Sequence, residues 1–419
     1  MRHPTLIYRI GFLFLIVLFL PFWASAETEP VLMSASTTII QEAAISQSDP
    51  LPKAVEESKT LLEKIDPQYR ITSQQVLNKK KKKVSIKILL RDLNVIGLNP
   101  ATNQLRNFIF EERMPVLTAN RPVQKPPQVI GQKDGCVLIW RGGSRWGFNR
   151  DLSLTCGEEK IIVTGLKFAY PQSGAVTKII KESYIPYSPE IHSEGIVKLG
   201  KEHLEKTIGQ AKVELLQAGV RSRAFPEKPI TEIAHPNFIK SLILNEHMDH
   251  AEFLKAMREQ TLPKLIEKIW VIIGLNKEKA MKLSVSKAGA CCLTQFMPKT
   301  YKLIAKRYPE AGLDKNIITG RQDHVNAVKA SIVLFDSDIA AGWKAKTKDI
   351  CGSSQDDLEK CLAASYNGGP GRLNKVVKKA GINWDNSKPT RILSGLKRET
   401  MVYLQKLANI KDFLKTKKD

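Results

Sequence analysis

The sequence lacks several motifs that identify common classes of protein. It contains no C-x-x-C motif, which argues against a zinc ribbon and against a thioredoxin-type site. The H-E-x-x-H pattern of zinc proteases is also absent, and His247 and His250 form only a lone H-x-x-H with no third ligand at a characteristic spacing. We therefore expect neither a metal site nor another cofactor. No internal repeat is present either.

Long apolar runs are scarce, and only one raises the question of a membrane. Ile10–Trp23 is almost wholly apolar, but its 14 residues fall short of the ~20 that a spanning helix needs. A basic start with Arg2 and Arg9 precedes it, and small residues at 24–26 follow it. This is the pattern of a secretory signal peptide over residues 1–26, with an uncleaved membrane anchor as the alternative. We expect export to the periplasm or cell envelope.

Acidic residues are few relative to basic ones. The chain has 42 Asp and Glu against 65 Lys and Arg, which gives a net charge of +23. A basic exported protein attracts anionic polymers, and in a cell envelope these are peptidoglycan peptides, anionic lipids or extracellular DNA. The five lysines at 79–83 are read as a solvated charge run at a domain edge, so nucleic acid is not the partner that we expect.

Cysteine is also scarce, with six residues in the whole chain. In an oxidising compartment such residues can pair, although the sequence alone does not fix the connectivity. We expect two bridges, Cys136–Cys156 and Cys351–Cys361. The adjacent Cys291 and Cys292 are expected to be free or paired to each other.

Composition and periodicity divide the chain after the signal segment. Short β-branched or aromatic runs separated by turn residues, such as VSIKILL from Val84 and CVLIW from Cys136, predict strands. Apolar residues at helical spacing from Val197 predict an amphipathic helix, and the chain after Pro229 looks helical. The fold class is therefore α+β and multidomain. The expected parts are 27–81, mostly linker with one possible helix over Ala54–Ile65; 82–190, a small β-rich domain; 191–225, a connecting helix; and 226–419, an all-α domain.

Three segments of the C-terminal part carry the clearest motifs. They are SVSKAGACCLTQFMPKTY at Ser284–Tyr301, LAASYNGGPG at Leu362–Gly371 and RETMVYLQK at Arg398–Lys406. In this order and spacing they resemble the soluble lytic transglycosylases, whose patterns read S-x-x-G-A-x-G-L-M-Q-x-M-P, A-Y-N-A-G-P-G and E-T-x-x-Y-V. The resemblance implies a goose-lysozyme-like fold for 226–419. It also implies cleavage of the MurNAc–GlcNAc bond of peptidoglycan with formation of 1,6-anhydroMurNAc, by a single Glu acting as acid and then as base.

The acid itself has two candidates. Cleaving a glycosidic bond requires a carboxylic acid that an apolar setting keeps neutral. In PNFIKSLILNEHMD, Pro236–Asp249, Glu246 falls on the apolar stripe of an expected helix, so burial would raise its pKa. Glu278 lies nearer the family's usual distance from Ser286. Choosing Glu246 implies a helical insertion over about His250–Lys282.

Six further positions match the motifs of the family. The resemblance implies that they contact the acid or the sugar: Ser286 near the acid, Gln295 and Met297 in the sugar cleft, Tyr366 and Asn367 as ring and amide contacts, and Tyr403 orienting the acid. The implied partner is the glycan strand of peptidoglycan, in wall turnover or in a secretion or cell-envelope assembly.

The chain departs from the family at Cys292, where glycine is usual, and a side chain there could narrow the cleft. The alternative function is therefore a non-catalytic peptidoglycan-binding or scaffold protein with a degenerate cleft. A third reading, a basic protein that binds DNA or the envelope, would differ by a steep salt dependence of binding.

Overall fold

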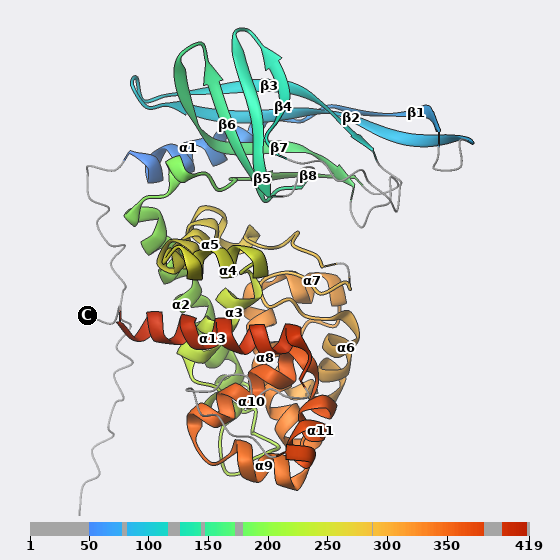
Figure 1. The fold of residues 1–419 in the computed structure, drawn as a ribbon, viewed down its shortest axis with the longest axis vertical. Helices are drawn as coiled ribbons and strands as arrows, with labels where there is room; N and C mark the ends of the chain where they lie inside the picture. Colours follow the sequence, from blue (N-terminus) through green and yellow to red (C-terminus); the bar gives the residue numbers. More distant parts are fainter. Residues whose placement is uncertain are drawn as a thin grey trace, which may run out of the picture. The chain divides into compact units, whose positions relative to one another are not determined.

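A computed structural model describes most of the chain. The described ranges are 50–77, 82–115, 126–143, 147–171, 179–286, 288–380 and 396–416. The expected signal peptide over 1–26 and three of the five lysines of the basic run lie outside them. Within these ranges an antiparallel β half-barrel over residues 69–184 precedes a helical region, which confirms the α+β class (Figure 1).

In the described part of the chain, eight strands form one antiparallel sheet. They are β1 (Tyr69–Leu77), β2 (Lys83–Asn99), β3 (Gln104–Pro115), β4 (Gln128–Lys133), β5 (Cys136–Gly143), β6 (Arg150–Cys156), β7 (Glu159–Pro171) and β8 (Ile179–Tyr184). The main order is β1-β2-β7-β6-β5-β4, while β3 pairs with β2 and β8 pairs with β7. In β5 and β6 buried and less buried residues alternate, as expected for strands with one face on a core.

A buried ion cluster lies inside this sheet. The Glu112 carboxylate accepts from Arg91 at 2.5 Å and from Arg150 at 3.0 Å, and all three side chains are almost fully buried. Arg150 also donates to the Gly147 carbonyl oxygen at 2.7 Å. Since buried charges are tolerated only when paired, this cluster fixes the start of β6 relative to β3.

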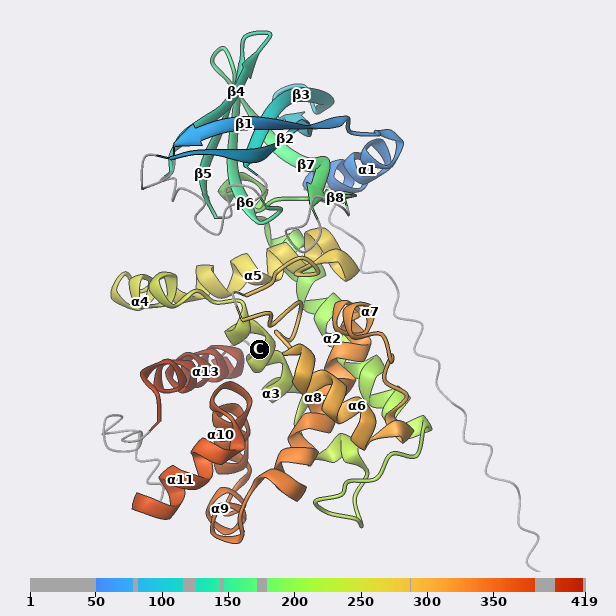
Figure 2. The ribbon, with the colours of Figure 1, turned by 90° about the vertical axis from the view of Figure 1, so that its right-hand side faces the viewer.

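The helices follow the sheet, apart from α1, which precedes it. They are α1 (Leu51–Lys64), α2 (Glu194–Gln217), α3 (Pro236–Glu246), α4 (His250–Arg258), α5 (Leu262–Asn276), α6 (Pro298–Arg307), α7 (Ile317–Gln322), α8 (His324–Ser337), α9 (Ala345–Cys351), α10 (Gln355–Gly368), α11 (Pro370–Ala380) and α13 (Arg398–Thr416). Helix α13 packs against α3 and α10 (Figure 2). Helices α2 and α5 approach each other closely at Gly200 and Gly274. A Cβ on Gly200 would lie 1.9 Å from the Trp270 carbonyl oxygen, and one on Gly274 would lie 2.5 Å from the Ile196 carbonyl oxygen.

Two expectations for the N-terminal part need correction. Residues 27–81 were expected to be mostly linker, but Tyr69–Leu77 forms β1 and pairs with β2, so the β-rich region begins before residue 82. Its last strand ends at Tyr184, before the expected boundary at 190. The expected helix of this segment is present as α1, and the connecting helix is α2.

All six cysteines are paired. The disulfides Cys136–Cys156 and Cys351–Cys361 are those that were predicted. Of the two alternatives left open for Cys291 and Cys292, the structure shows the vicinal pair. Disulfides of this kind fit an oxidising, extracytoplasmic environment. Within the described ranges no helix combines the length and apolar character needed to cross a bilayer.

Candidate active site

Helix α3 places Glu246 at the end of an apolar helix. Pro236 is its first residue, where the missing N–H costs nothing, and the His235 ring accepts from the Asn237 backbone N–H. Ile239, Leu242 and Ile243 are buried, and Glu246 follows them on the same stripe. The amphipathic pattern therefore brings a carboxyl group to the edge of the helical core.

Two residues of α13 hold the C-terminal end of α3. The Tyr403 hydroxyl donates to Glu246 Oε1 at 2.7 Å, and the Tyr403 side chain is buried. Buried Lys406 donates to the carbonyl oxygens of Asn245 at 3.0 Å and Met248 at 2.7 Å. A cation at these carbonyls also complements the negative end of the helix dipole. The acid is thus oriented by a helix that lies more than 150 residues away in sequence.

The environment of Glu246 favours its neutral form. Burial raises the pKa of this carboxyl to about 7, against the opposing effects of the Tyr403 hydrogen bond and the charge of Lys406. Nearby His247 is affected in the opposite direction, because burial lowers its pKa to about 4. Its neutral ring donates from Nε2 to the Leu293 carbonyl oxygen at 2.7 Å, which ties the end of α3 to the loop before α6. A carboxyl that is part protonated near pH 7 can act as a general acid.

Glu246 borders two cavities. One, of about 340 Å³, is also lined by Ser284 and Gln295. The other, of about 620 Å³, is also lined by Asn367 and Tyr403. Glu246 is therefore a wall residue that the two cavities share.

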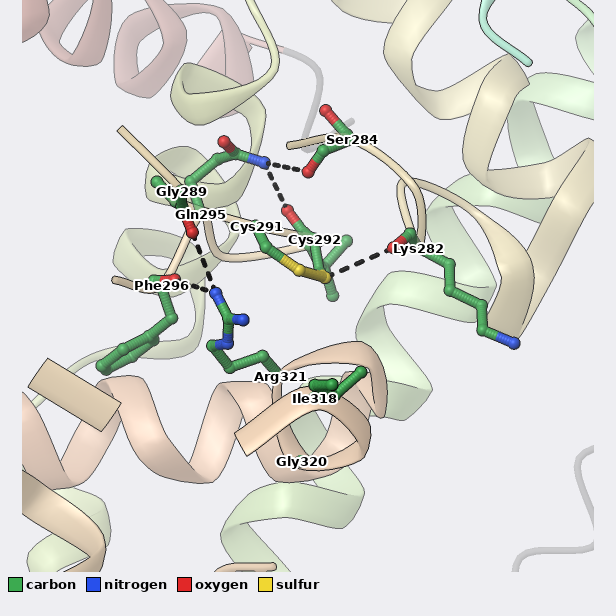
Figure 3. The surroundings of a disulfide bond; sticks show 12 residues. Lys282, Ser284, Gly289, Cys291, Cys292, Gln295, Phe296, Ile318, Gly320 and Arg321 are labelled. Atoms are coloured by element: carbon green, nitrogen blue, oxygen red, sulfur yellow. Dashed lines mark hydrogen bonds between the residues drawn. A yellow bond between two sulfur atoms is a disulfide. The ribbon is translucent and has the colours of Figure 1, made fainter. Parts of the chain in front are cut away.

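The loop before α6 positions Gln295 for such a ligand. The Gln295 Nε2 donates to the carbonyl oxygens of Cys292 at 2.8 Å and Ser284 at 3.3 Å (Figure 3). Arg321 of α7 supports the same loop by donating to the carbonyl oxygens of Gly289 and Phe296, each at 3.0 Å. These bonds fix the orientation of the Gln295 side-chain amide. They leave its carbonyl oxygen, Oε1, as the group that can face a ligand.

Cys292 does not narrow the cavity. Its side chain is fully buried, and its sulfur lies 3.4 Å from the Lys282 carbonyl oxygen (Figure 3). Its φ is +74°, in the left-handed region that glycine adopts most easily. The backbone therefore has a conformation typical of glycine, and the side chain of Cys292 is buried outside the lining of the cavity.

Tyr366 and Asn367 lie at the end of α10, in different settings. The Asn367 side chain lines the larger cavity, and its Oδ1 accepts from the Thr400 hydroxyl at 2.8 Å. Tyr366 donates its hydroxyl to the Thr294 carbonyl oxygen and packs against Phe296 and Phe335. Burial raises the pKa of Tyr366, with a further contribution from the nearby Glu246. Tyr366 thus supports the loop that carries Gln295 and does not line either cavity.

Three candidates lie elsewhere. The exposed Ser286 uses its hydroxyl to accept from the Ala290 backbone N–H at 3.0 Å, which closes a local turn. Met297, the residue before α6, is 38% exposed and lies outside both cavities. Glu278, the alternative acid, has an 80% exposed side chain and lies outside them too. Ser284, two positions before Ser286, takes the place in the cavity that the motif assigned to Ser286.

Sequence reasoning missed other residues that line the smaller cavity. Asn149, Asp151 and Tyr187 come from the region before the helical domain, and no motif pointed to them. Lys406 was also missed, although its position three residues after Tyr403 places it on the same face of α13.

The described residues include no group of three or more His, Cys, Asp or Glu side chains arranged to hold a metal ion. The acids, amides and hydroxyls that line the two cavities can bind a ligand with many hydroxyl groups. Comparisons with protein-family models, with curated proteins and with solved structures found no match to this chain.

Proposed function

We propose that the protein is an exported lytic transglycosylase that cleaves the MurNAc–GlcNAc bond of peptidoglycan, with Glu246 as its acid and base. The observation that carries the proposal is the setting of Glu246: a carboxyl with a pKa of about 7, hydrogen-bonded by Tyr403, on a residue that lines two cavities. Gln295 and Asn367 offer planar amides on either side, which suit the hydroxyl groups of sugars. The periplasm or cell envelope is the compartment that this substrate requires.

The proposed reaction uses Glu246 twice. The neutral carboxyl protonates the glycosidic oxygen as the bond from C1 of MurNAc breaks, and GlcNAc leaves with a free hydroxyl group. The carboxylate then takes the proton of the C6 hydroxyl of the same MurNAc as that oxygen bonds to C1. The product is a 1,6-anhydro ring, and Glu246 is neutral again without consumption of water.

The other carboxyl groups that line the smaller cavity are each held by a partner. Asp151 accepts from Arg141 at 2.9 Å, and Glu252 pairs with Lys268 at 3.0 Å. Asp249 accepts from two backbone N–H groups at the start of α4. A hydrolase needs a second carboxylate as nucleophile or base. Glu399, which lines the larger cavity together with Glu246, is the carboxyl to test for that role.

The test compares Glu246→Gln with the matched control Glu278→Gln on purified peptidoglycan. Gln keeps the shape of the side chain but cannot donate the proton, so release of anhydromuropeptides should fall by about 10²–10⁴-fold in the first variant. The control, at an exposed position, should remain active. Full activity of Glu246→Gln would refute the assignment. If the wild-type protein binds peptidoglycan but releases no product, the glycan-binding alternative is correct.

A further inference from the structure

The region before the helical domain contributes to the cavity that contains Glu246. Asn149 and Asp151, around the start of β6, and Tyr187, after β8, line the 340 Å³ cavity together with Glu246 and Gln295. All of these residues belong to one compact unit of the chain. The β-rich region is therefore a candidate part of the same site.

Buried hydrogen bonds fix this region against the helices. Asn276, the last residue of α5, accepts at Oδ1 from the Ile185 N–H and donates from Nδ2 to the Ile185 carbonyl oxygen, both at 2.9 Å. Close by, Lys279 donates to the Ser183 hydroxyl at 2.9 Å. Buried amide pairs of this kind are costly to break, because both partners would lose their hydrogen bonds away from water. The end of β8, and Tyr187 two residues after Ile185, are thereby held beside α5.

Buried neighbours also hold Asn149 in place. It precedes Arg150, whose guanidinium is buried on Glu112. The buried Tyr184 donates its hydroxyl to Asn149 Oδ1, which leaves the Nδ2 donors without a partner among the described residues. Asn149 lines the 340 Å³ cavity and also an adjoining one of about 240 Å³, and Met281 and Ser284 line both as well. Asn149 therefore presents its amide on a residue that lines both cavities.

Tyr187 adds an aromatic ring to the same cavity. Its hydroxyl is 3.1 Å from His192 Nδ1, and the Lys268 ammonium lies 5.6 Å from the ring centroid. These contacts orient the ring, and the residue remains partly exposed. Flat rings that pack on the C–H faces of sugars, next to amides that bond their hydroxyls, are typical of carbohydrate sites.

We propose that Asn149 and Tyr187 are substrate-positioning residues, so that the N-terminal β-rich region forms part of the groove for a glycan strand. This inference rests on the proposed function. The three cavities share wall residues in series: Glu246 lines the 620 and 340 Å³ cavities, and Asn149 lines the 340 and 240 Å³ cavities. We take them as parts of one groove that extends beyond the site of cleavage, and the substrate that such a groove fits is a polymeric strand.

The experiment measures kcat and KM of Asn149→Ala and Tyr187→Ala on solubilised glycan strands. The matched control is Gln132→Ala, which removes an exposed amide of β4 outside these cavities. Loss of one hydrogen bond or ring contact in the groove should raise KM about tenfold and leave kcat within about twofold. The control should match wild type. Each variant is also made with Glu246→Gln, and its binding to insoluble peptidoglycan should weaken about tenfold.

Asn149→Asp covers the case in which the alanine variant does not fold. It keeps the acceptor for Tyr184 and removes the Nδ2 donors, so the same rise in KM is expected. Folded variants with wild-type KM and binding would overturn the inference, and so would a fall in kcat at constant KM. If Glu246→Gln is inactive while these variants behave as wild type, only this inference fails. If wild type neither binds nor cleaves glycan, the proposed function fails with it.

Discussion

The raised pKa of Glu246 predicts a specific pH dependence of stability. The pKa of this carboxyl is about 7 in the folded chain and near 4.5 in the unfolded one. Its contribution to the free energy of unfolding is therefore complete below about pH 4.5 and is lost as the pH rises through 7. A difference of this size corresponds to about 3 kcal/mol. Since Gln does not titrate, the free energy of unfolding of wild type minus that of Glu246→Gln should fall by about 3 kcal/mol between pH 4 and pH 9.

The assay is urea unfolding of both proteins at several pH values, with the disulfides intact. The comparison between the two proteins cancels other titrating groups, including Asp338, whose pKa burial also raises to about 7. Glu278→Gln, at an exposed position, serves as the control and should show a constant difference from wild type. A constant difference for Glu246→Gln as well would mean that the carboxyl titrates normally, and the argument for a neutral acid would be wrong.

Three further predictions follow from the contacts. Glu112→Gln leaves two buried arginines poorly paired and should lower the free energy of unfolding by about 3–5 kcal/mol; a loss under about 1 kcal/mol in urea unfolding would contradict the role given to this cluster. Tyr403→Phe removes a hydrogen bond that lowers the pKa of Glu246, so the alkaline limb of the pH–rate profile should move to higher pH; an unmoved limb would show that the hydroxyl does not act on the acid. Cys291→Ser combined with Cys292→Gly should keep glycan binding, measured on insoluble peptidoglycan, because the Cys292 side chain faces away from the cavity; lost binding in a folded variant would count against this.

The helix that carries Glu246 could be predicted because its pattern is strong. Apolar residues recur at helical spacing from Ile239, and Pro236 marks the start, so both the helix and the place of Glu246 at the end of its apolar stripe follow from sequence. Strand β1 could not be predicted in the same way. It lies at the end of the strand order and its apolar residues are largely exposed, Leu77 by 65%, so no alternation of buried and exposed residues marks it.

The sequence motifs predicted the position of some residues at the cavities correctly and that of others wrongly. The motifs located Gln295, Asn367 and Tyr403, which the fold brings around Glu246. They assigned Ser286 as well, but a turn closed by its own hydroxyl directs that side chain away, and Ser284 lines the cavity instead. Local turn geometry of this kind depends on hydrogen bonds that a motif does not encode.

Isotope labelling of the product tests the central claim most directly. The protein is incubated with purified peptidoglycan in water enriched in oxygen-18, and the released muropeptides are analysed by mass spectrometry. Because the C6 hydroxyl of MurNAc attacks C1, the account predicts 1,6-anhydro products that carry no oxygen-18 and are lighter than the hydrolysis products by one water. Reducing-end products labelled with oxygen-18 would show that water attacks C1, and would contradict the transglycosylase assignment.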